Sequence, residues 1–469
     1  MVRGAVAAVA AGALVAVTPP CAGAAEPGGY GFDPAGRRVT AAPATTTAQL
    51  LEPGGTYRSS LPPDGKSYYR LALDAVSTTY VAVTAVPPPG TEVAASDGIR
   101  VALQDADGHY CSTDTASIGG ARSPRPVTAW GTREAGNGRP ACKDAGTYYV
   151  AVERLRTSTS SATASGVAWE LELTAAAEAP LKRPGPTSAP EAEPSESLPP
   201  PAGPARRRPG GSGFASAAPV GEGAWSATLA PGQTLFYKVP VDWGQRLSAT
   251  AELSSAPATT SGLVSGALGL HLSNPARVPV DDATVSYGGT PKTAALDALP
   301  SVRYANRYAV QDSVSGMRVA GAYYLAVHLS ERVAERFGAG PFEVTLRVRV
   351  AGAERQPGPE YAGPSVPADA FRVTDEDRTA AAIGSSGLAA PAGGSVGGSE
   401  GGSEGGSEGG EAAGRSGGSG GGTAMKALAA GGIGGGTLLL GVLGAWTLLA
   451  RRRAASGAQT RVRAQNPTA

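Results

Sequence analysis

Ser67-Tyr-Tyr-Arg-Leu-Ala-Leu-Asp74 carries the pattern on which the fold of this chain depends. Its apolar residues alternate, so that Tyr69, Leu71 and Leu73 share one face of an extended strand. A later stretch, Leu235-Phe-Tyr-Lys-Val-Pro-Val-Asp242, lines up with it position by position. Alternation of this kind between Gly- and Pro-containing turns is typical of half-buried strands, so both stretches predict β structure.

The match extends along most of two segments and predicts an internal duplication. Several short strands separated by turns favour a sandwich or barrel, and no amphipathic helix is predicted. The order of the matched positions is the same in both segments, which is harder to obtain by chance than one shared motif. The further matches are Tyr57 with Trp225, Leu61 with Leu229, Pro63 with Pro231, residues 99–105 with 268–274, 146–152 with 321–327, and 169–173 with 342–346.

These stretches also carry a family resemblance. Leu229-Ala-Pro-Gly-Gln-Thr-Leu-Phe-Tyr-Lys-Val239, followed by Gly321-Ala-Tyr-Tyr-Leu-Ala-Val327, resembles the bacterial pre-peptidase C-terminal (PPC) domain. The first copy has Leu61-Pro-Pro-Asp-Gly65 at the turn and fits less closely. The resemblance covers the strand frame of both copies, and it implies a small β-sandwich or jelly roll that accompanies secreted enzymes or surface proteins.

A second resemblance concerns the composition of the chain and the proteins in which similar stretches occur. The Ala- and Gly-rich, Lys-poor composition is similar to that of high-GC actinobacteria, and similar stretches occur in actinobacterial surface proteins with a von Willebrand A domain. The Asp-x-Ser-x-Ser metal motif of that domain is not found in this sequence, so its metal-dependent adhesion does not carry over.

Composition limits the class of protein. The 469 residues include 67 Gly and 39 Pro, and the formal net charge is +1. A chain of this length has room for about three domains, but its Gly-, Pro- and Ser-rich parts cannot pack a core. The rest of the chain is enough for two folded domains. The balanced charge gives no indication that the protein binds nucleic acid or an acidic substrate.

Both ends of the chain predict export and membrane anchoring. Arg3, an apolar run over residues 5–17 and small residues at 22–24 form the plan of a secretory signal peptide. The alternatives are a first membrane helix, for which the run is too short, and a lipoprotein at Cys21, for which the preceding Pro20 is unsuitable. Residues 427–450 carry no charge and are followed by three arginines, which predicts a single span with a cytoplasmic tail.

A sortase signal is the rival interpretation of this C-terminus, but no Leu-Pro-x-Thr-Gly or Leu-Ala-x-Thr-Gly motif precedes the span. Glycine pairs in the span favour close helix packing only weakly, so the oligomeric state stays open. The predicted fold is therefore all-β: two tandem β-sandwich or jelly-roll-like domains, disordered linkers and one C-terminal transmembrane helix. The predicted boundaries are signal peptide 1–25, lead-in 26–46, first sandwich 47–174, Pro-rich linker 175–213, second sandwich 214–350, disordered Gly/Ser/Glu stalk 351–423, transmembrane helix 424–450 and basic cytoplasmic tail 451–469.

Removal of the signal peptide leaves two cysteines, Cys111 and Cys142. An even pair in an exported chain predicts a disulfide. The rival interpretation, a pair of reactive or metal-binding thiols, has no nearby Cys-x-x-Cys or His pair to support it. The segment between them is rich in Gly, Pro, Arg and Ser, and contains none of the predicted strands.

Catalytic and metal-binding patterns are sparse, so we expect no enzyme and no cofactor. His109, His271 and His328 lack a second His at metal-ligand spacing. A Gly-x-Ser-x-Gly match at residues 393–397 lies in the glycine-rich linker, away from the strand-to-helix turn that a nucleophile elbow needs. Asp105-Ala-Asp107-Gly108 offers carboxylates to Ca²⁺, but an ordinary Asp-Gly turn is the preferred interpretation.

Three aromatic residues are candidates for ligand binding: Trp130, Tyr148 and Tyr323. The tyrosines belong to Tyr-Tyr pairs on strands, in which one ring points in and the other out. An exposed ring can stack on a sugar or anchor a partner. For Trp130 the alternative is that the ring pins the segment between the cysteines to the core.

The sequence therefore predicts a non-catalytic cell-surface protein with two β modules that bind cell-wall glycan or a protein partner. The alternative is an accessory membrane subunit of a secretion apparatus or surface enzyme complex.

Overall fold

The computed structural model describes residues 29–135, 141–156, 166–192, 196, 198–257, 261–353 and 357–386. Within these ranges, no helix combines the length and apolar character needed to cross a membrane. The predicted signal peptide, the predicted transmembrane helix and the predicted cytoplasmic tail lie outside the described residues.

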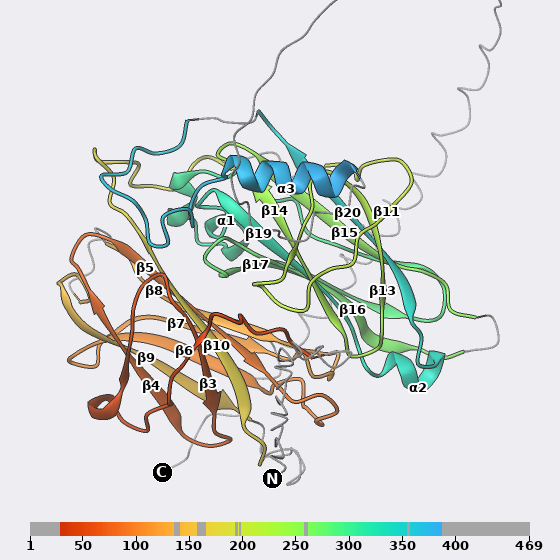
Figure 1. Ribbon diagram of the computed structural model, residues 1–469, viewed down its shortest axis with the longest axis horizontal. Coiled ribbons are helices and arrows are strands. Elements are labelled where there is room, and N and C mark those ends of the chain that lie inside the picture. The colour runs from red at the N-terminus through yellow and green to blue at the C-terminus, as the bar shows by residue number, and fades with distance from the viewer. Residues whose placement is uncertain are drawn as a thin grey trace, which may run out of the picture. The chain divides into compact units, whose positions relative to one another are not determined.

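Strands dominate the described part of the chain and form four five-stranded sheets, two in each repeat (Figure 1). The first repeat is coloured from red through orange to yellow and the second mainly green to cyan. In the first repeat, one sheet has the order β1 (Arg37–Arg38), β3 (Thr56–Leu61), β10 (Trp169–Glu178), β5 (Thr78–Val86), β8 (Val127–Arg133), and the other β2 (Gln49–Leu51), β4 (Lys66–Leu73), β9 (Gly146–Leu155), β6 (Gly98–Asp105), β7 (Tyr110–Ser117).

The second repeat has the same order of strands in both sheets. Its short helical elements are outnumbered by strands, as in the first repeat, where η1 (Thr45–Thr47) is the described helical turn. The sheets are β11 (Arg206–Arg207), β13 (Gly223–Leu229), β20 (Phe342–Ala351), β15 (Arg246–Leu253), β18 (Lys292–Ala295), and β12 (Ala218–Pro219), β14 (Thr234–Val241), β19 (Gly321–Leu329), β16 (Val264–Ser273), β17 (Pro279–Tyr287). The helical elements are η2 (Tyr304–Tyr308), α1 (Asp312–Ser315), α2 (Val333–Phe337) and α3 (Asp375–Ser386).

Residue register supports the predicted duplication. Leu61 of β3 lies opposite Trp169 of β10, and Leu229 of β13 lies opposite Phe342 of β20. The sequence comparison matches Leu61 with Leu229 and Trp169 with Phe342, so matched residues have matched partners across the strands. Alternating burial follows the predicted pattern, because Tyr69, Leu71 and Leu73 of β4 all face the core. The prediction of an all-β fold with two sandwiches is thus confirmed.

The predicted disulfide joins Cys111 to Cys142, with an S–S distance of 2.05 Å. The segment between them contains most of β7 and all of β8, which lie at the edges of the two sheets of the first repeat and have no strand signal in our sequence analysis. Both strands contain many Thr, Ser and Gly residues, and their neighbours in the sheets supply the regularity that their own composition lacks.

We expect the double substitution Cys111→Ser, Cys142→Ser to lower the free energy of unfolding by roughly 3.5 kcal/mol, since the bond closes a loop of about 30 residues in the unfolded chain. Urea denaturation of the oxidised and reduced wild type and of the variant measures this. Reductant should shift the wild-type midpoint and leave that of the variant in place. An unchanged wild-type midpoint would contradict the prediction.

The segments predicted as lead-in, linker and stalk differ from expectation. β1 lies in the lead-in, and β11 and the end of β10 lie in the linker. Within the predicted stalk, Val366 and Tyr361 form bridges with Ala177 and Leu181, and α3 contacts β12 and β14 (Figure 1). The stalk prediction is therefore wrong for residues 357–386. Proline-rich composition conceals such order, because the hydrogen-bonding partners are far away in the sequence.

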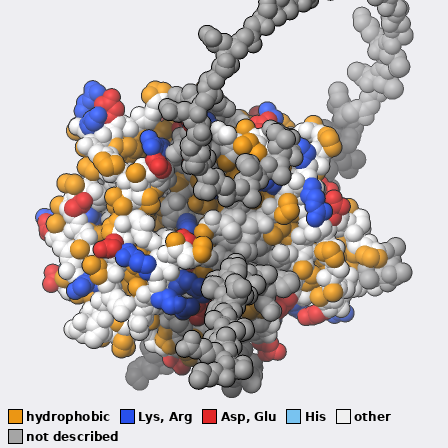
Figure 2. Space-filling model, viewed as in Figure 1, with side chains coloured by type: hydrophobic (Ala, Val, Ile, Leu, Met, Phe, Trp, Pro, Cys, Tyr) orange, Lys and Arg blue, Asp and Glu red, His pale blue; other side chains and the backbone are white. Residues whose placement is uncertain are grey.

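The two sandwiches belong to one compact unit and are joined by buried ion pairs. Glu178 at the end of β10 pairs with Arg307 of η2 at 2.7 Å, and Glu134 pairs with Arg318. Glu172 of β10 pairs with Arg277, which follows β16. On the face drawn in Figure 2, acidic and basic side chains are interspersed, as expected from the balanced charge.

Candidate functional site

A cavity of about 590 Å³ lies where the two sandwiches meet. It is within the size range of sites that enclose small ligands. Strands β7 and β8 of the first sandwich contribute to its lining, as do β14, β16, β17, β19 and α1 of the second, together with residues of the loops beside them. We call it the junction cavity. Neither repeat alone could form it.

Aromatic side chains form part of the wall. Trp130 of β8 is half-buried, and its ring stacks on that of the buried Tyr80, with centroids 6.4 Å apart and an angle of 28°. The rings of Phe236, on β14, and Phe214 pack with their centroids 5.0 Å apart. The cavity lining includes Trp130, Phe214 and Phe236. An aromatic ring held from behind in this way can offer a flat apolar surface to a ligand.

Arg125 contributes a cation to the same cavity. Its guanidinium donates to the backbone carbonyl oxygens of Ser117, Ile118 and Pro126 at 3.1–3.3 Å. Burial lowers the pKa of Arg125 to about 10. The side chain therefore stays charged at neutral pH, held by carbonyl groups of its own repeat.

His328 of β19 joins the repeats through a short hydrogen-bond chain. Its Nε2 lies 3.2 Å from Oγ of Ser123, and its Nδ1 lies 3.0 Å from Oγ1 of Thr234. The Ser123 hydroxyl also accepts the backbone N–H of Glu331 at 3.0 Å. Because that hydroxyl is already an acceptor, it donates to Nε2 of a neutral imidazole most readily.

Both histidines at the cavity are held in the neutral form. Burial, aided by the charge of Arg125, lowers the pKa of His328 to about 3. Burial also lowers the pKa of His271 well below its usual value, with further contributions from Arg125 and His328. The junction therefore favours unprotonated imidazoles.

Acidification should destabilise the folded chain through His328. An unfolded His has a pKa near 6.5, so between pH 6.5 and 3 the unfolded state binds more protons, and stability falls as the pH drops. From pH 7 to 5 we expect a loss of about 2 kcal/mol from this residue. Urea titrations at both pH values measure it.

The variant His328→Gln should flatten this pH dependence. An undiminished slope in His328→Gln would contradict the assignment. The cavity carboxylates are common to the wild type and the variant, so the difference between the two slopes isolates the contribution of His328.

Carboxylates also belong to the cavity lining. Asp114 lies on β7 and Asp312 begins α1, while Asp281 and Asp282 are adjacent on β17. Burial raises the pKa of Asp114, and the charge of Asp312 raises it further. Burial likewise raises the pKa of Asp281, with added repulsion from Asp297 and Asp282. The junction thus brings like charges from both repeats together.

The predicted binding tyrosines are in the wrong place for ligand contact. Tyr148 and Tyr323 are 3% and 0% exposed, and their hydroxyls donate to the carbonyl oxygens of Asp144 and Val319. Each packs in its core, and the prediction for both is wrong. Their neighbours Tyr149 and Tyr324 are half-buried, in keeping with the expected alternation. Trp130 packs on Tyr80, in agreement with its structural interpretation, and it also lines the cavity, while its role in ligand binding stays a prediction.

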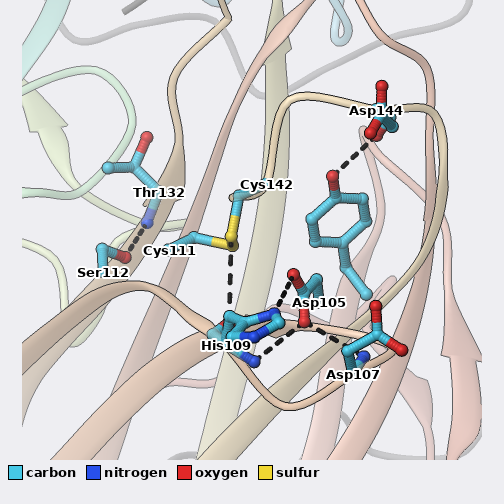
Figure 3. Close-up of a disulfide and its surroundings, with 9 residues drawn as sticks. Asp105, Asp107, His109, Cys111, Ser112, Thr132, Cys142 and Asp144 are labelled. Carbon is cyan, nitrogen blue, oxygen red and sulfur yellow. Dashed lines mark hydrogen bonds and ion pairs between the residues drawn. A yellow bond between two sulfur atoms is a disulfide. The ribbon is translucent and has the colours of Figure 1, made fainter. Parts of the chain in front are cut away.

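The candidate calcium turn folds around Asp105 (Figure 3). Its carboxylate accepts the backbone N–H groups of Asp107 and His109 at 3.1 and 2.8 Å, and lies 3.1 Å from Nδ1 of His109. Ligand atoms of these three residues lie within 4.8 Å of one another. His109 is a member of this group that sequence spacing did not suggest. The hydrogen bonds account for the arrangement as a turn, without an ion.

Sequence reasoning did not identify Arg125, Asp114, Asp281 or Asp312 as members of one site. They come from segments that are up to about 200 residues apart, and none belongs to a local motif. Only the packing of one repeat on the other brings them together.

No protein-family model matches this chain, and no curated protein matches it. Solved structures with some likeness include the PPC domain of collagenase from Bacillus anthracis (14% identity, TM-score 0.17, covering 27% of this chain and 93% of that chain). A second is the CBM22-1–CBM22-2 tandem domain of Paenibacillus barcinonensis Xyn10C, with 10% identity and a TM-score of 0.16, covering 64% of this chain and 92% of that chain. A third is the ANXUR2 extracellular domain from Arabidopsis thaliana, with 10% identity and a TM-score of 0.17, covering 63% of this chain and 85% of that chain. At such TM-scores these likenesses carry no argument about function.

Proposed function

We propose that this chain is a non-catalytic cell-surface protein that binds a cell-wall glycan in the junction cavity. The observation that carries the proposal is the composition of that cavity. A half-buried tryptophan, hydroxyl-bearing side chains and carboxylates line a space of about 590 Å³. Sugar rings present apolar faces to aromatic rings and hydroxyl groups to polar side chains, so this lining suits a saccharide.

The state of Ser123 and His328 supports a binding role in place of catalysis. They form a hydrogen-bonded Ser–His pair, the arrangement that nucleophilic enzymes use. Here, however, Ser123 is 0% exposed and is not part of the cavity lining, so a substrate has no access to its hydroxyl group. A histidine with a pKa of about 3 is also a poor general base at neutral pH. The pair holds the repeats together.

The proposal includes the membrane anchor. An uncharged run at residues 427–450, followed by Arg451, Arg452 and Arg453, supports a single span with both sandwiches outside the cell. The glycine-rich segment before the span would serve as a spacer. A binding unit held in this manner can reach wall polymers while it remains attached to the membrane.

Binding of the full-length chain to purified cell-wall glycan, in sedimentation assays and by calorimetry with soluble fragments, tests this function. Trp130→Ala should weaken binding at least tenfold by removing the stacking surface, while thermal melting verifies that the variant is folded. Tyr110→Ala is the matched control, because Tyr110 is 59% exposed and does not line the junction cavity. Failure of the wild type to bind any wall glycan would refute the proposal.

A further inference from the structure

The junction cavity has an excess of acidic groups that the fold itself does not neutralise. Among the described residues, no ion pair includes Asp114, Asp281, Asp282 or Asp312. This contrasts with Glu134, Glu172 and Glu178, which are paired with arginines at the same junction. At the junction, some carboxylates are therefore paired with arginines, whereas those of the cavity lining are in no such ion pair.

The cations of the cavity are already engaged. Arg318 pairs with Glu134 and also donates to the carbonyl oxygen of Ser315. Arg125 directs its donors to three backbone carbonyls, and the nearby histidines are neutral at physiological pH. Four carboxylates of the lining therefore face one cation, Arg125, whose donors are directed to carbonyl groups and whose charge interacts with that of Asp282. A cationic ligand would relieve this imbalance.

Hydrogen bonding within the protein leaves the carboxylates able to receive such a ligand. Asp114 accepts the backbone N–H of Trp130 at 3.2 Å, and Asp281 accepts that of Asp297 at 2.9 Å. A carboxylate has about four lone-pair sites, so each can accept further donors. Asp114 and Trp130 are thus adjacent, which places an acceptor beside the aromatic surface.

Spacing of the acids favours an organic cation over a single metal ion. Within the described residues, the group of three metal-type ligands that converge to within 4.8 Å is Asp105, Asp107 and His109, outside the junction cavity. The cavity carboxylates are distributed over β7, β17 and α1 instead. Amino groups placed at intervals along a sugar chain match distributed acids, and Trp130 provides a surface for a ring.

We propose that the junction cavity selects saccharides with free, protonated amino groups, which Asp114 and Asp312 bind while a sugar ring stacks on Trp130. This inference rests on the proposed glycan-binding function and specifies its ligand class. The donors are ammonium groups, which form strong hydrogen bonds with carboxylates. An N-acetylated amine lacks this charge, so the same sugar in acetylated form should bind more weakly.

Calorimetry with the full-length chain compares two oligosaccharides of equal length, a glucosamine oligomer and its N-acetylated counterpart, at pH 6.0 so that the amines are protonated. The glucosamine oligomer should bind at least tenfold more tightly in low salt, and the difference should shrink as salt screens the charges. Asp114→Asn with Asp312→Asn should remove the preference. Asp107→Asn, an exposed acid elsewhere, should retain it.

The outcomes separate this inference from the proposed function. Equal binding of both oligomers, abolished by Trp130→Ala, would overturn the amine preference and retain glycan binding. Binding of neither oligomer, together with no binding to wall glycan, would overturn both. An amine preference that survives in the double Asn variant would overturn the assignment to Asp114 and Asp312. Because the Asn side chains remove repulsion without changing size, the variant should fold, and thermal melting verifies this.

Discussion

Replacement of Arg307 by methionine should destabilise the chain by about 3–5 kcal/mol, because it leaves a buried carboxylate without its cation. Glu178 is 1% exposed and pairs with Arg307 at 2.7 Å, across the junction between the sandwiches. It also accepts the hydroxyls of Tyr80 and Tyr361 at 2.9 and 2.8 Å. Those neutral donors do not replace the lost charge. Urea denaturation measures the change.

Two controls test this explanation. Adding Glu178→Gln to Arg307→Met removes both charges and should recover part of the lost stability. Arg183→Met breaks a similar pair with Glu360, at 3.1 Å, whose side chains are 81% and 61% exposed. That change should cost less than about 1 kcal/mol. If the double variant is as unstable as the sum of its single substitutions, the buried charge is not the cause.

Trp169→Ala should lower the free energy of unfolding by about 3–5 kcal/mol, since it empties a large volume in the first core. Trp169 is 0% exposed on β10 and lies opposite Leu61 of β3. The guanidinium of Arg154 stacks over its ring, with Cζ 3.3 Å from the ring centroid. The loss of this contact adds to the cost of the cavity. Urea denaturation at pH 7 measures the total.

The second repeat suggests the control. Phe342 occupies the position of Trp169 and lies opposite Leu229, so the fold accepts phenylalanine there. Trp169→Phe should therefore cost clearly less than Trp169→Ala. Equal losses for both would show that ring volume is not what the site requires.

The disulfide and several of the strands could be predicted from local sequence patterns alone. Cys111 and Cys142 were predictable as a pair because they are the cysteines left once the predicted signal peptide is set aside. β4 and β14 were predictable from alternation, since one face of each is buried. β7 lacks a sustained apolar face, and its pairing with β6 stabilises it. Such a strand leaves no clear signal in its own residues.

The segments that flank the sandwiches could not be predicted from their local sequence. Residues 357–386 are rich in Pro, Ala and charged residues, which indicates little order when the segment is considered alone. In the folded chain, the rings of Phe371 and Tyr80 pack with their centroids 5.7 Å apart, and Arg378 forms an ion pair with Asp242 at 2.6 Å. Their partners are more than 100 residues away in the sequence. Local composition therefore underestimates the order of this segment.

By itself, the sequence determined the all-β class, the duplication and the disulfide pair, because each leaves a local or repeating pattern of residue types. The tertiary structure alone revealed that the repeats pack on each other, that Tyr148 and Tyr323 are buried, and that a cavity joins Trp130 to acids of both sandwiches. Period-two alternation assigns a side chain to a face of a strand, but the packing of sheets decides which faces meet. A site built from residues of two repeats therefore has no linear signature.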